Sequence, residues 1–281
     1  MVKIMIDSAA DINVTEAENK GVIMIPMLIT IGEEEFYDGV NLSSEAFWGK
    51  LLESDVLPKT SLINSYRFEK AFEQHTKDGD ELIVITISSK LSGTYESARQ
   101  AAEKFKGKVY VIDSLNACVG ERLLCDYALR LREEGLSVEE IVKNLEEKKT
   151  KIKLMALLST LEYLKRGGRI SSTVAFAGEL IALKPIVGVV DGAVKLIGKA
   201  IGTKKGTILL NKFIQETGGI DFNMPFATIW SGLESTSLEN YVKDSANIFG
   251  GLTDSIPKYI LGATIGTHVG PGVVGVAFFE K

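Results

Sequence analysis

The sequence predicts an α/β protein of two domains: an N-terminal parallel-sheet domain over residues 1–150 and a C-terminal α/β domain with a mostly antiparallel sheet over residues 151–281. Three observations support this prediction. The chain has 281 residues, a length that suits two α/β domains better than one small core. Its first half alternates β-rich runs with amphipathic stretches, as parallel strands with crossover helices do. Its second half places Asp191-Gly192 between two apolar runs, which is a strong hairpin signal.

The N-terminal sheet is expected to contain four strands, at residues 2–7, 22–30, 81–88 and 108–113. Three of these runs end in polar residues, and parallel strands bring such ends to one edge of a sheet, where ligands commonly bind. The polar residues at this edge are Asp7, Ser8, Ser88, Ser89, Ser92, Asp113 and Ser114. Two helices are expected between the second and third strands, near residues 45–52 and 67–75.

The C-terminal domain is expected to begin after the Lys-rich stretch at residues 146–153. Residues 186–190 and 193–197 should pair as the hairpin around Asp191-Gly192. Helices are expected at residues 207–216 and 238–249, and strands at 226–230 and 273–280. Residues 173–183 are apolar on nearly every side, so they predict either a simple buried helix or one that lines an internal tunnel.

Composition excludes several classes of protein. Hydrophobic residues make up 45% and charged residues 25% of the chain, which is typical of a globular protein and excludes disordered and fibrous ones. The 32 basic and 37 acidic residues are well mixed and give a net charge of -5, so nucleic acid is not an expected partner. Because Lys3 and Asp7 interrupt the N-terminus, we expect no signal peptide, no membrane anchor and a cytoplasmic location.

Few side chains are available for metal or redox chemistry. The chain has two cysteines and two histidines, too few for a zinc site, so no metal and no cofactor are expected. Cys118 and Cys125 lie on one predicted helix, where their spacing favours two buried thiols over a disulfide.

Two hydroxyl-rich segments are candidate anion sites. Ser92, Gly93 and Thr94 lie where a buried strand leads into an amphipathic helix, and backbone N–H groups and hydroxyls at such a point can hold a carboxylate or phosphate. The alternative is that Ser92 or Thr94 only caps the helix. Thr60 and Ser61 follow Pro58 in a predicted loop, for which a purely structural role is the simpler interpretation.

Two glycine-containing segments complete the set of candidates. Residues 165–169 read Lys-Arg-Gly-Gly-Arg and predict a helix C-terminus at which Gly168 or its neighbour adopts a left-handed conformation, with Arg169 solvated. Residues 266–272 place His268 and Gly270 in a predicted glycine-rich turn, from which the imidazole could donate to an anion. The alternative is a turn in which a backbone carbonyl satisfies the histidine.

Together these segments resemble the DegV family of bacterial fatty-acid-binding proteins. The resemblance extends from about Lys3 to Phe279. The segments that carry it are Ile6-Asp7-Ser8 with Asp11, Pro58-Lys59-Thr60-Ser61, residues 89–94, 112–114 and 164–170, Lys184-Pro185 and residues 268–272.

The resemblance implies a long-chain fatty acid bound between the two domains, with its tail in the C-terminal domain. Its carboxylate would be held by Thr60 and Ser92, with the His268 turn nearby. Nearby loop residues would be Ser61, Gly93, Thr94, Gly168, Arg169 and Gly270. The resemblance also implies a carrier rather than an enzyme, one that presents the fatty acid to a separate fatty acid kinase, which makes acyl phosphate for phospholipid synthesis.

The chain departs from the family pattern at two places. Leu62-Ile63 follows Thr60-Ser61 where the family usually has Gln-Pro, and Ile201 stands before Gly202 where the family commonly has Arg. The first departure bears on the geometry of the loop near the ligand. The second bears on engagement of the kinase.

Two other functions compete with fatty acid binding. One is a Ser/His hydrolase of acyl esters, with Ser92 as nucleophile and His268 as base. It would also need an orienting acid, for which Asp7 and Asp113 are candidates, and an oxyanion hole. The other is an interaction protein with an apolar core and no ligand.

Overall fold

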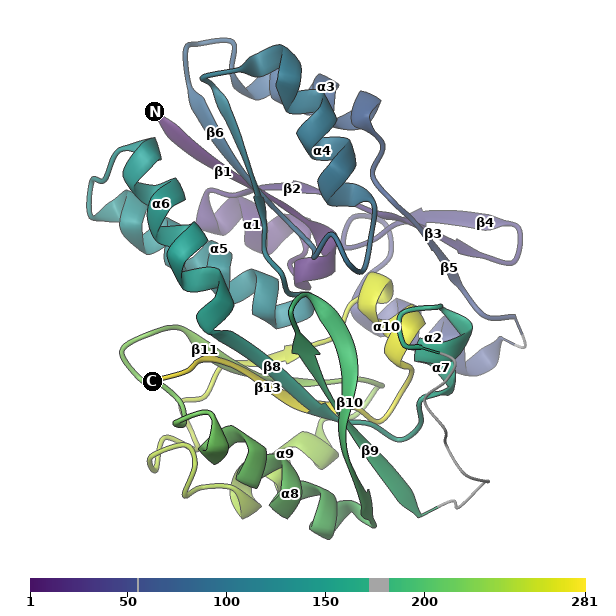
Figure 1. Ribbon diagram of the computed structural model, residues 1–281. Helices are drawn as coiled ribbons and strands as arrows, with labels where there is room; N and C mark the ends of the chain where they lie inside the picture. Colours follow the sequence, from purple (N-terminus) through teal and green to yellow (C-terminus); the bar gives the residue numbers. More distant parts are fainter. Residues whose placement is uncertain (55, 172–181) are drawn as a thin grey trace.

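The computed structural model describes residues 1–54, 56–171 and 182–281. Two main sheets with helices packed around them form an α/β structure (Figure 1). The first is a parallel sheet of order β2-β1-β6-β7, and the second has six strands in the order β10-β9-β8-β13-β11-β12. The predicted fold class, with one parallel sheet and one mostly antiparallel sheet, is therefore confirmed.

The parallel sheet is built from short apolar strands with a buried interior. Its strands are β1 (Val2–Asp7), β2 (Ile23–Ile25), β6 (Glu81–Thr86) and β7 (Val109–Asp113). The helices around it are α1 (Val14–Lys20), α3 (Ser65–His75), α4 (Thr94–Ala102), α5 (Cys118–Glu133) and α6 (Val138–Lys148). The side chains of Asn13, Asn64 and Ser137 accept N-terminal amides of α1, α3 and α6, which fixes where these helices begin.

The expected single strand at residues 22–30 is instead two strands in different sheets. Pro26 and Met27 separate β2 from β3 (Leu28–Ile31), because proline cannot donate to a continuing ladder. β3 pairs with two further strands in a small antiparallel sheet that the sequence did not predict. These are β4 (Glu34–Tyr37) and β5 (Lys59–Ser61). Thr60 therefore lies on a strand and not in a loop.

The six-stranded sheet is antiparallel except for one pair, β11 with β12. Its strands are β8 (Ile152–Leu157), β9 (Leu183–Val190), β10 (Ala193–Ile201), β11 (Phe226–Trp230), β12 (Lys258–Ile260) and β13 (Val274–Phe279). Its outer face is covered by α8 (Thr203–Glu216) and α9 (Thr236–Asp244) (Figure 1). The predicted helix at residues 238–249 thus ends earlier, at Asp244. Of the apolar segment at residues 173–183, only the last two lie among the described residues, and Leu183 begins β9.

The hairpin of β9 and β10 is confirmed, and it stands partly free of the sheet. Asp191 and Gly192 both have positive φ, as a two-residue hairpin turn requires. β9 pairs with β10 from Leu183 to Val190 but with β8 only from Ile186 to Gly188. The tip of the hairpin reaches the N-terminal half (Figure 1), where the Ser88 hydroxyl donates to the Gly192 carbonyl at 2.7 Å.

The predicted glycine-rich turn at residues 266–272 is for the most part a helix, α10 (Ala263–Val269). The glycine at position 266 serves packing and not a turn, because a side chain there would collide with the rings of Phe47 and Trp48. These rings belong to α2 (Ser44–Glu53). Gly270 ends the helix with a φ of 70°, so His268 lies in its last turn.

N-terminal residues hold the start of α10 in a buried set of contacts that we call the clasp: Asp11, Asp38, Trp48 and Arg122. The Asp38 carboxylate accepts the amides of Ala263 and Thr264 at 3.1 and 3.0 Å. Asp11 accepts the Gly262 amide at 2.7 Å, and the Trp48 indole donates to the Leu261 carbonyl at 2.9 Å. These bonds fix α10 against the N-terminal half of the molecule.

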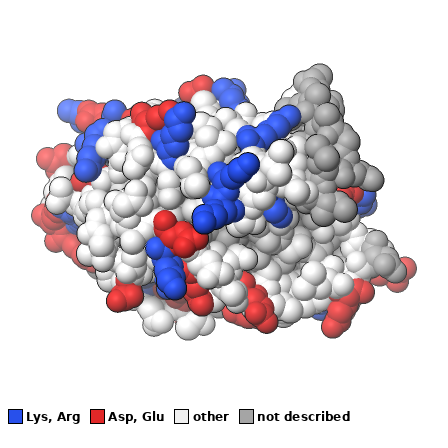
Figure 2. Space-filling model, turned by 90° about the horizontal axis from the view of Figure 1, so that it is seen from below, with Lys and Arg blue, Asp and Glu red and all other residues white. Residues whose placement is uncertain are grey.

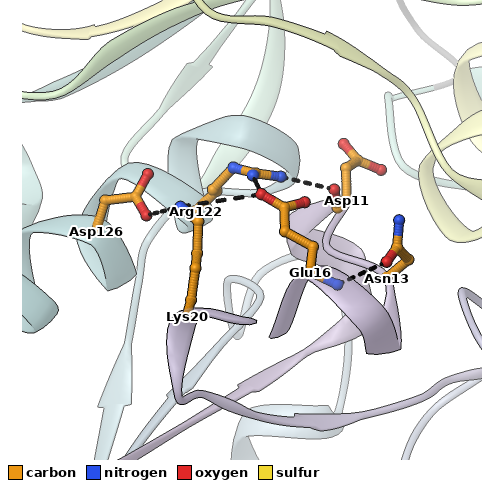
Figure 3. Close-up of polar contacts among 6 residues, drawn as sticks. All are labelled: Asp11, Asn13, Glu16, Lys20, Arg122 and Asp126. Carbon is orange, nitrogen blue, oxygen red and sulfur yellow. Dashed lines mark hydrogen bonds and ion pairs between the residues drawn. The ribbon is translucent and has the colours of Figure 1, made fainter. Parts of the chain in front are cut away.

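Arg122 completes the clasp from α5. Its guanidinium lies over the Tyr259 ring at 3.6 Å from the centroid, a favourable cation–π geometry. It also donates to the Asp11 carbonyl and pairs with Glu16, while Lys20 bridges Glu16 and Asp126 (Figure 3). Arg122 is fully buried, so these partners are needed to offset its lost hydration.

One continuous core joins the two halves of the chain. It contains residues of the parallel sheet, such as Ile4 and Val84, and residues of the second sheet, such as Leu154 and Phe279. The boundary near residue 150 falls between α6 and β8 and stays a prediction. Cys118 and Cys125 are buried thiols on α5 that form no disulfide, as expected.

The described ranges contain no helix with the length and apolarity needed to cross a bilayer. On the face seen from below, Lys and Arg side chains are interspersed with Asp and Glu over broad uncharged areas (Figure 2). This face therefore has no large patch of side chains with the same charge.

Candidate ligand-binding site

An apolar cavity of about 240 Å³ lies between the clasped N-terminal elements and the inner face of the six-stranded sheet. Its polar lining groups come from Thr60, Ser61, Ser92, Arg169, Thr264 and His268. The remaining walls are largely aliphatic and include Leu154, Ala156, Leu158, Val187, Val189, Val194, Ile229 and Val273. Such a cavity matches a ligand with a long apolar body and one polar group.

Thr60 and His268 meet inside this cavity although they are far apart in the sequence. The imidazole Nε2 lies 2.9 Å from the Thr60 hydroxyl oxygen. Burial, together with the nearby charge of Arg169, lowers the pKa of His268 to about 4. The imidazole is therefore neutral at pH 7.

The surroundings of Nδ1 indicate which nitrogen of the His268 imidazole carries the proton. Nδ1 is buried without a hydrogen-bond partner, and the positive Arg169 lies close enough to lower the pKa of the ring. A lone pair at Nδ1 suits this environment better than a proton does, which leaves the proton on Nε2. Nε2 then donates to Thr60, and the Thr60 hydroxyl keeps its own proton free for a ligand.

Ser92 is supported in a similar way by Thr94. Their hydroxyl oxygens lie 2.9 Å apart, and Thr94 also accepts the Ile63 amide at 3.4 Å. With Thr94 donating to Ser92, the Ser92 proton is free to point into the cavity. A proline at position 63 would have no amide to donate, so Ile63 adds a contact behind Ser92.

The helix-capping interpretation of this segment is only partly correct. The N-cap of α4 is Gly93, which has no side chain. Ser92 does accept the Thr94 amide at 3.3 Å, but the Thr94 side chain points to Ser92 and Ile63. Gly93 lines the cavity, while Thr94 is fully buried behind it.

The expectation that Arg169 is solvated is wrong. The helix α7 (Glu162–Arg166) ends as predicted, and Gly168, with a φ of 69°, reverses the chain. Arg169 is then half-buried on the cavity wall, and its Nε donates to the Leu91 carbonyl at 3.2 Å. A fixed positive charge beside Ser92 and His268 favours an anion there.

The two remaining candidate glycines act through the backbone. Gly168 is exposed and only redirects the chain. Gly270 is buried against Tyr163, whose ring leaves no room for a side chain. Gly167 likewise packs on the His268 imidazole, so any side chain at 167 would push the ring away.

A second cavity, of about 600 Å³, lies beside the clasp and is lined by polar residues such as Asn13, Glu16 and Glu45. It is larger than the first, but Thr60, Ser92 and His268, the residues expected to hold a carboxylate, do not line it. Its buried carboxylates Asp11 and Asp38 are engaged by the amides at the start of α10. We therefore assign the candidate site to the smaller, apolar cavity.

Comparison with known proteins agrees with this geometry. The model of a family described as uncharacterised protein, DegV family, matches residues 1–281. The chain belongs to the DegV family. Among its DegV relatives, a DegV domain-containing protein from Caldanaerobacter subterraneus subsp. tengcongensis is 34% identical over 284 residues, which cover 100% of this chain and 99% of that protein.

Solved DegV structures share the whole fold. A fatty-acid-binding DegV family protein from Thermus thermophilus is 28% identical, with a TM-score of 0.87, and the match covers 100% of this chain and 99% of that one. A stearic-acid-binding protein from Eubacterium ventriosum is 25% identical, with a TM-score of 0.85 and the same coverage. The resemblance inferred from the sequence motifs is confirmed.

This DegV chain does not assemble the hydrolase constellation among its described residues. His268 bonds to Thr60, and no hydrogen bond joins it to Ser92 in the described ranges. The candidate acids are used elsewhere, since Asp7 accepts the amides of Ala9 and Ile87 and Asp113 accepts those of Ser89 and Leu115. Nor do the described residues include a cluster of His, Cys, Asp or Glu that could hold a metal.

Sequence reasoning missed two parts of the DegV site. The clasp escaped notice because Asp38, just after β4, and Trp48, on α2, carry no local signal until α10 packs on them. Ala117 and Cys118, at the start of α5, also line the cavity. Their position after the polar end of β7 was the available signal, because this edge of the sheet was expected to face a ligand.

Proposed function

We propose that this DegV protein binds a long-chain fatty acid with its carboxylate at Thr60 and Ser92. The observation that carries the proposal is the pair of hydroxyls on a largely apolar cavity, each within hydrogen-bond distance of a second polar side chain. Arg169 supplies positive charge nearby. The relatives described as binding fatty acid and stearic acid support the same ligand class.

The energetics favour this assignment. Burying about a dozen methylenes at ~0.8 kcal/mol each contributes on the order of 10 kcal/mol before the cost of association. A carboxylate must be withdrawn from water at the same time, and it needs hydrogen-bond donors to offset the loss. The acyl chain of the ligand would supply the affinity, and the two hydroxyls would fix the orientation of the ligand.

The direct test is the content of the cavity after purification. Protein expressed in bacteria and purified without detergent is extracted with organic solvent, and its fatty acids are quantified by mass spectrometry against protein. We expect near-stoichiometric fatty acid. A Thr60→Val, Ser92→Ala double variant should retain much less, and wild-type protein without any lipid would contradict the proposal.

We further propose that the protein acts as a carrier, not as an enzyme, and presents the fatty acid to a separate fatty acid kinase. In that step the carboxylate attacks the γ-phosphate of ATP, giving acyl phosphate and ADP. The support is the family resemblance, together with a site that would hold a carboxylate under the proposal above and whose described residues assemble no catalytic triad. The test is ATP-dependent formation of acyl phosphate, trapped as the hydroxamate, from loaded protein plus a bacterial fatty acid kinase. Product formed equally well without this protein would contradict the carrier role.

A further inference from the structure

A third cavity, of about 260 Å³, adjoins the candidate site on the far side of one strand pair. The two cavities share three lining residues: Leu154 on β8 and Gly188 and Val189 on β9. These residues form a wall common to the two spaces. The shared wall therefore decides how far an acyl chain in the first cavity can extend.

The strands diverge at this wall. β8 and β9 are paired from Leu157↔Ile186 to Met155↔Gly188, and their ladder ends there. Beyond that point β9 continues beside β10 as far as Val190. We call the opening between the diverging strands the fork. It is bounded by Leu154 and Val189, whose backbones would pair if the ladder continued.

Gly188 stands at the base of the fork, where it carries no side chain. A Cβ there would lie 3.3 Å from Ile197 Cδ1 and 3.6 Å from the Leu154 carbonyl oxygen. Ile197 lines the third cavity and not the first. A side chain at position 188 would thus fill the far space while leaving the carboxylate end untouched.

The third cavity is apolar within and charged at its rim. Met155 and Ile197 line it together with Leu115, whereas Lys153 and Asp191 also border it. A hydrocarbon end is compatible with the apolar part, but it would desolvate the charged rim if it extended further. The rim therefore sets an upper limit on chain length.

From these observations we propose that the fork is the terminal subsite for the methyl end of the longest acyl chains, with Gly188 as the residue that sets the length limit. This inference rests on the proposed binding of fatty acids. Short chains would end within the first cavity. Longer ones would pass between β8 and β9 and end in the third cavity.

The test is a binding series with laurate, palmitate, stearate and arachidate on delipidated protein, measured by displacement of a fluorescent fatty acid. In the wild type, affinity should rise roughly fourfold with each added methylene that is buried. Gly188→Val should weaken the binding of arachidate roughly tenfold or more relative to the binding of laurate. Thr217→Phe, which fills the same cavity from the end of α8, should act likewise and carries the test if the valine variant does not fold.

The matched control is Gly49→Val, at a helical position where a Cβ meets nothing within 4 Å. It should leave the whole series unchanged. Equal losses for laurate and arachidate in the Gly188 and Thr217 variants, or no loss for either acid, would overturn the inference. Failure of the wild type to bind any of the four acids would instead refute the proposed function.

Discussion

The His268 imidazole lies 2.9 Å from the Thr60 hydroxyl, across a sequence separation of 208 residues. One partner lies on the short strand β5 and the other in the last turn of α10. The candidate site therefore depends on how the start and the end of the chain are held together, as well as on its lining groups.

Removing either hydroxyl should weaken the binding of a fatty acid. A hydrogen bond to a charged group contributes roughly 1.5 to 3 kcal/mol, so Ser92→Ala and Thr60→Val should each raise the Kd by about one to two orders of magnitude. Because both groups would serve one carboxylate, the double variant should not be additive. Titration calorimetry with the free acid measures the effect.

The methyl ester is the control for this prediction, because its head group carries no charge. Its weaker binding should respond much less to either substitution. Equal losses for acid and ester, in variants with native circular dichroism spectra, would mean that the two hydroxyls act only in packing.

Replacing Ile201 by arginine should leave fatty acid binding nearly unchanged and alter coupling to a kinase. Ile201 is 63% exposed at the end of β10 and does not line the candidate cavity. The arginine is the residue that the family resemblance leads us to expect at this position. The readouts are the Kd for fatty acid and the rate of acyl phosphate formation with a fatty acid kinase. A large change in Kd with an unchanged rate is the opposite pattern and would refute the assignment.

The clasp should matter for both stability and binding. Asp38→Ala leaves the buried amides of Ala263 and Thr264 without their acceptor, a change expected to lower the free energy of unfolding by roughly 2 to 4 kcal/mol. It should also loosen His268 and weaken fatty acid binding. Denaturant unfolding and the Kd for fatty acid are the two measurements.

Asp126→Ala is the matched control for Asp38→Ala, because this carboxylate pairs with Lys20 near the surface and has no bond to α10. It should change both quantities much less. If Asp38→Ala lowered stability but left the affinity unchanged after correction for the unfolded fraction, the clasp would have no part in positioning the site.

The neutral state of His268 predicts a pH dependence with a definite sign. Burial lowers its pKa from 6.5 to about 4, so the unfolded chain binds more protons between these values. The contribution of neutral His268 to the free energy of unfolding is therefore present above pH 6.5. It is lost as the pH falls towards 4, by up to roughly 3 kcal/mol. Burial raises the pKa of Asp7 and of Asp11 to about 7, which stabilises the folded chain as the pH falls.

Asp7 and Asp11 are present in both proteins, so their contributions to stability cancel when the wild type is compared with His268→Gln. The stability difference between the two proteins should shift in favour of the glutamine variant as the pH falls through this window. Denaturant unfolding over the range measures the difference. A difference independent of pH would show that His268 titrates normally.

Much of the fold could be predicted because its signals are local. β-rich runs marked the strands, amphipathic stretches marked the helices, and Asp191-Gly192 marked the hairpin. One error arose where a tertiary contact decides the structure. Gly266 was interpreted as part of a turn, although its lack of a side chain lets α10 pack on Phe47 and Trp48.

The candidate site shows the same division. Thr60, Ser92 and His268 could be named from motifs, but their partners could not. Arg169 turns inward because Gly168 reverses the chain and the Leu91 carbonyl accepts a hydrogen bond from the Arg169 Nε. The fork depends on where β8 stops pairing with β9. Such features arise from long-range packing, which no short window of sequence contains.

The clasp also has a consequence for the order in which the site can form. α10 spans Ala263–Val269 and rests on Asp38 and Trp48, which precede it by more than 200 residues and are therefore made well before it. During synthesis these N-terminal groups stay without their α10 partners until residues 263–269 have been made. A nascent or truncated chain that lacks residues 263–269 cannot join Thr60 to His268, so the candidate site forms only after α10 has been made.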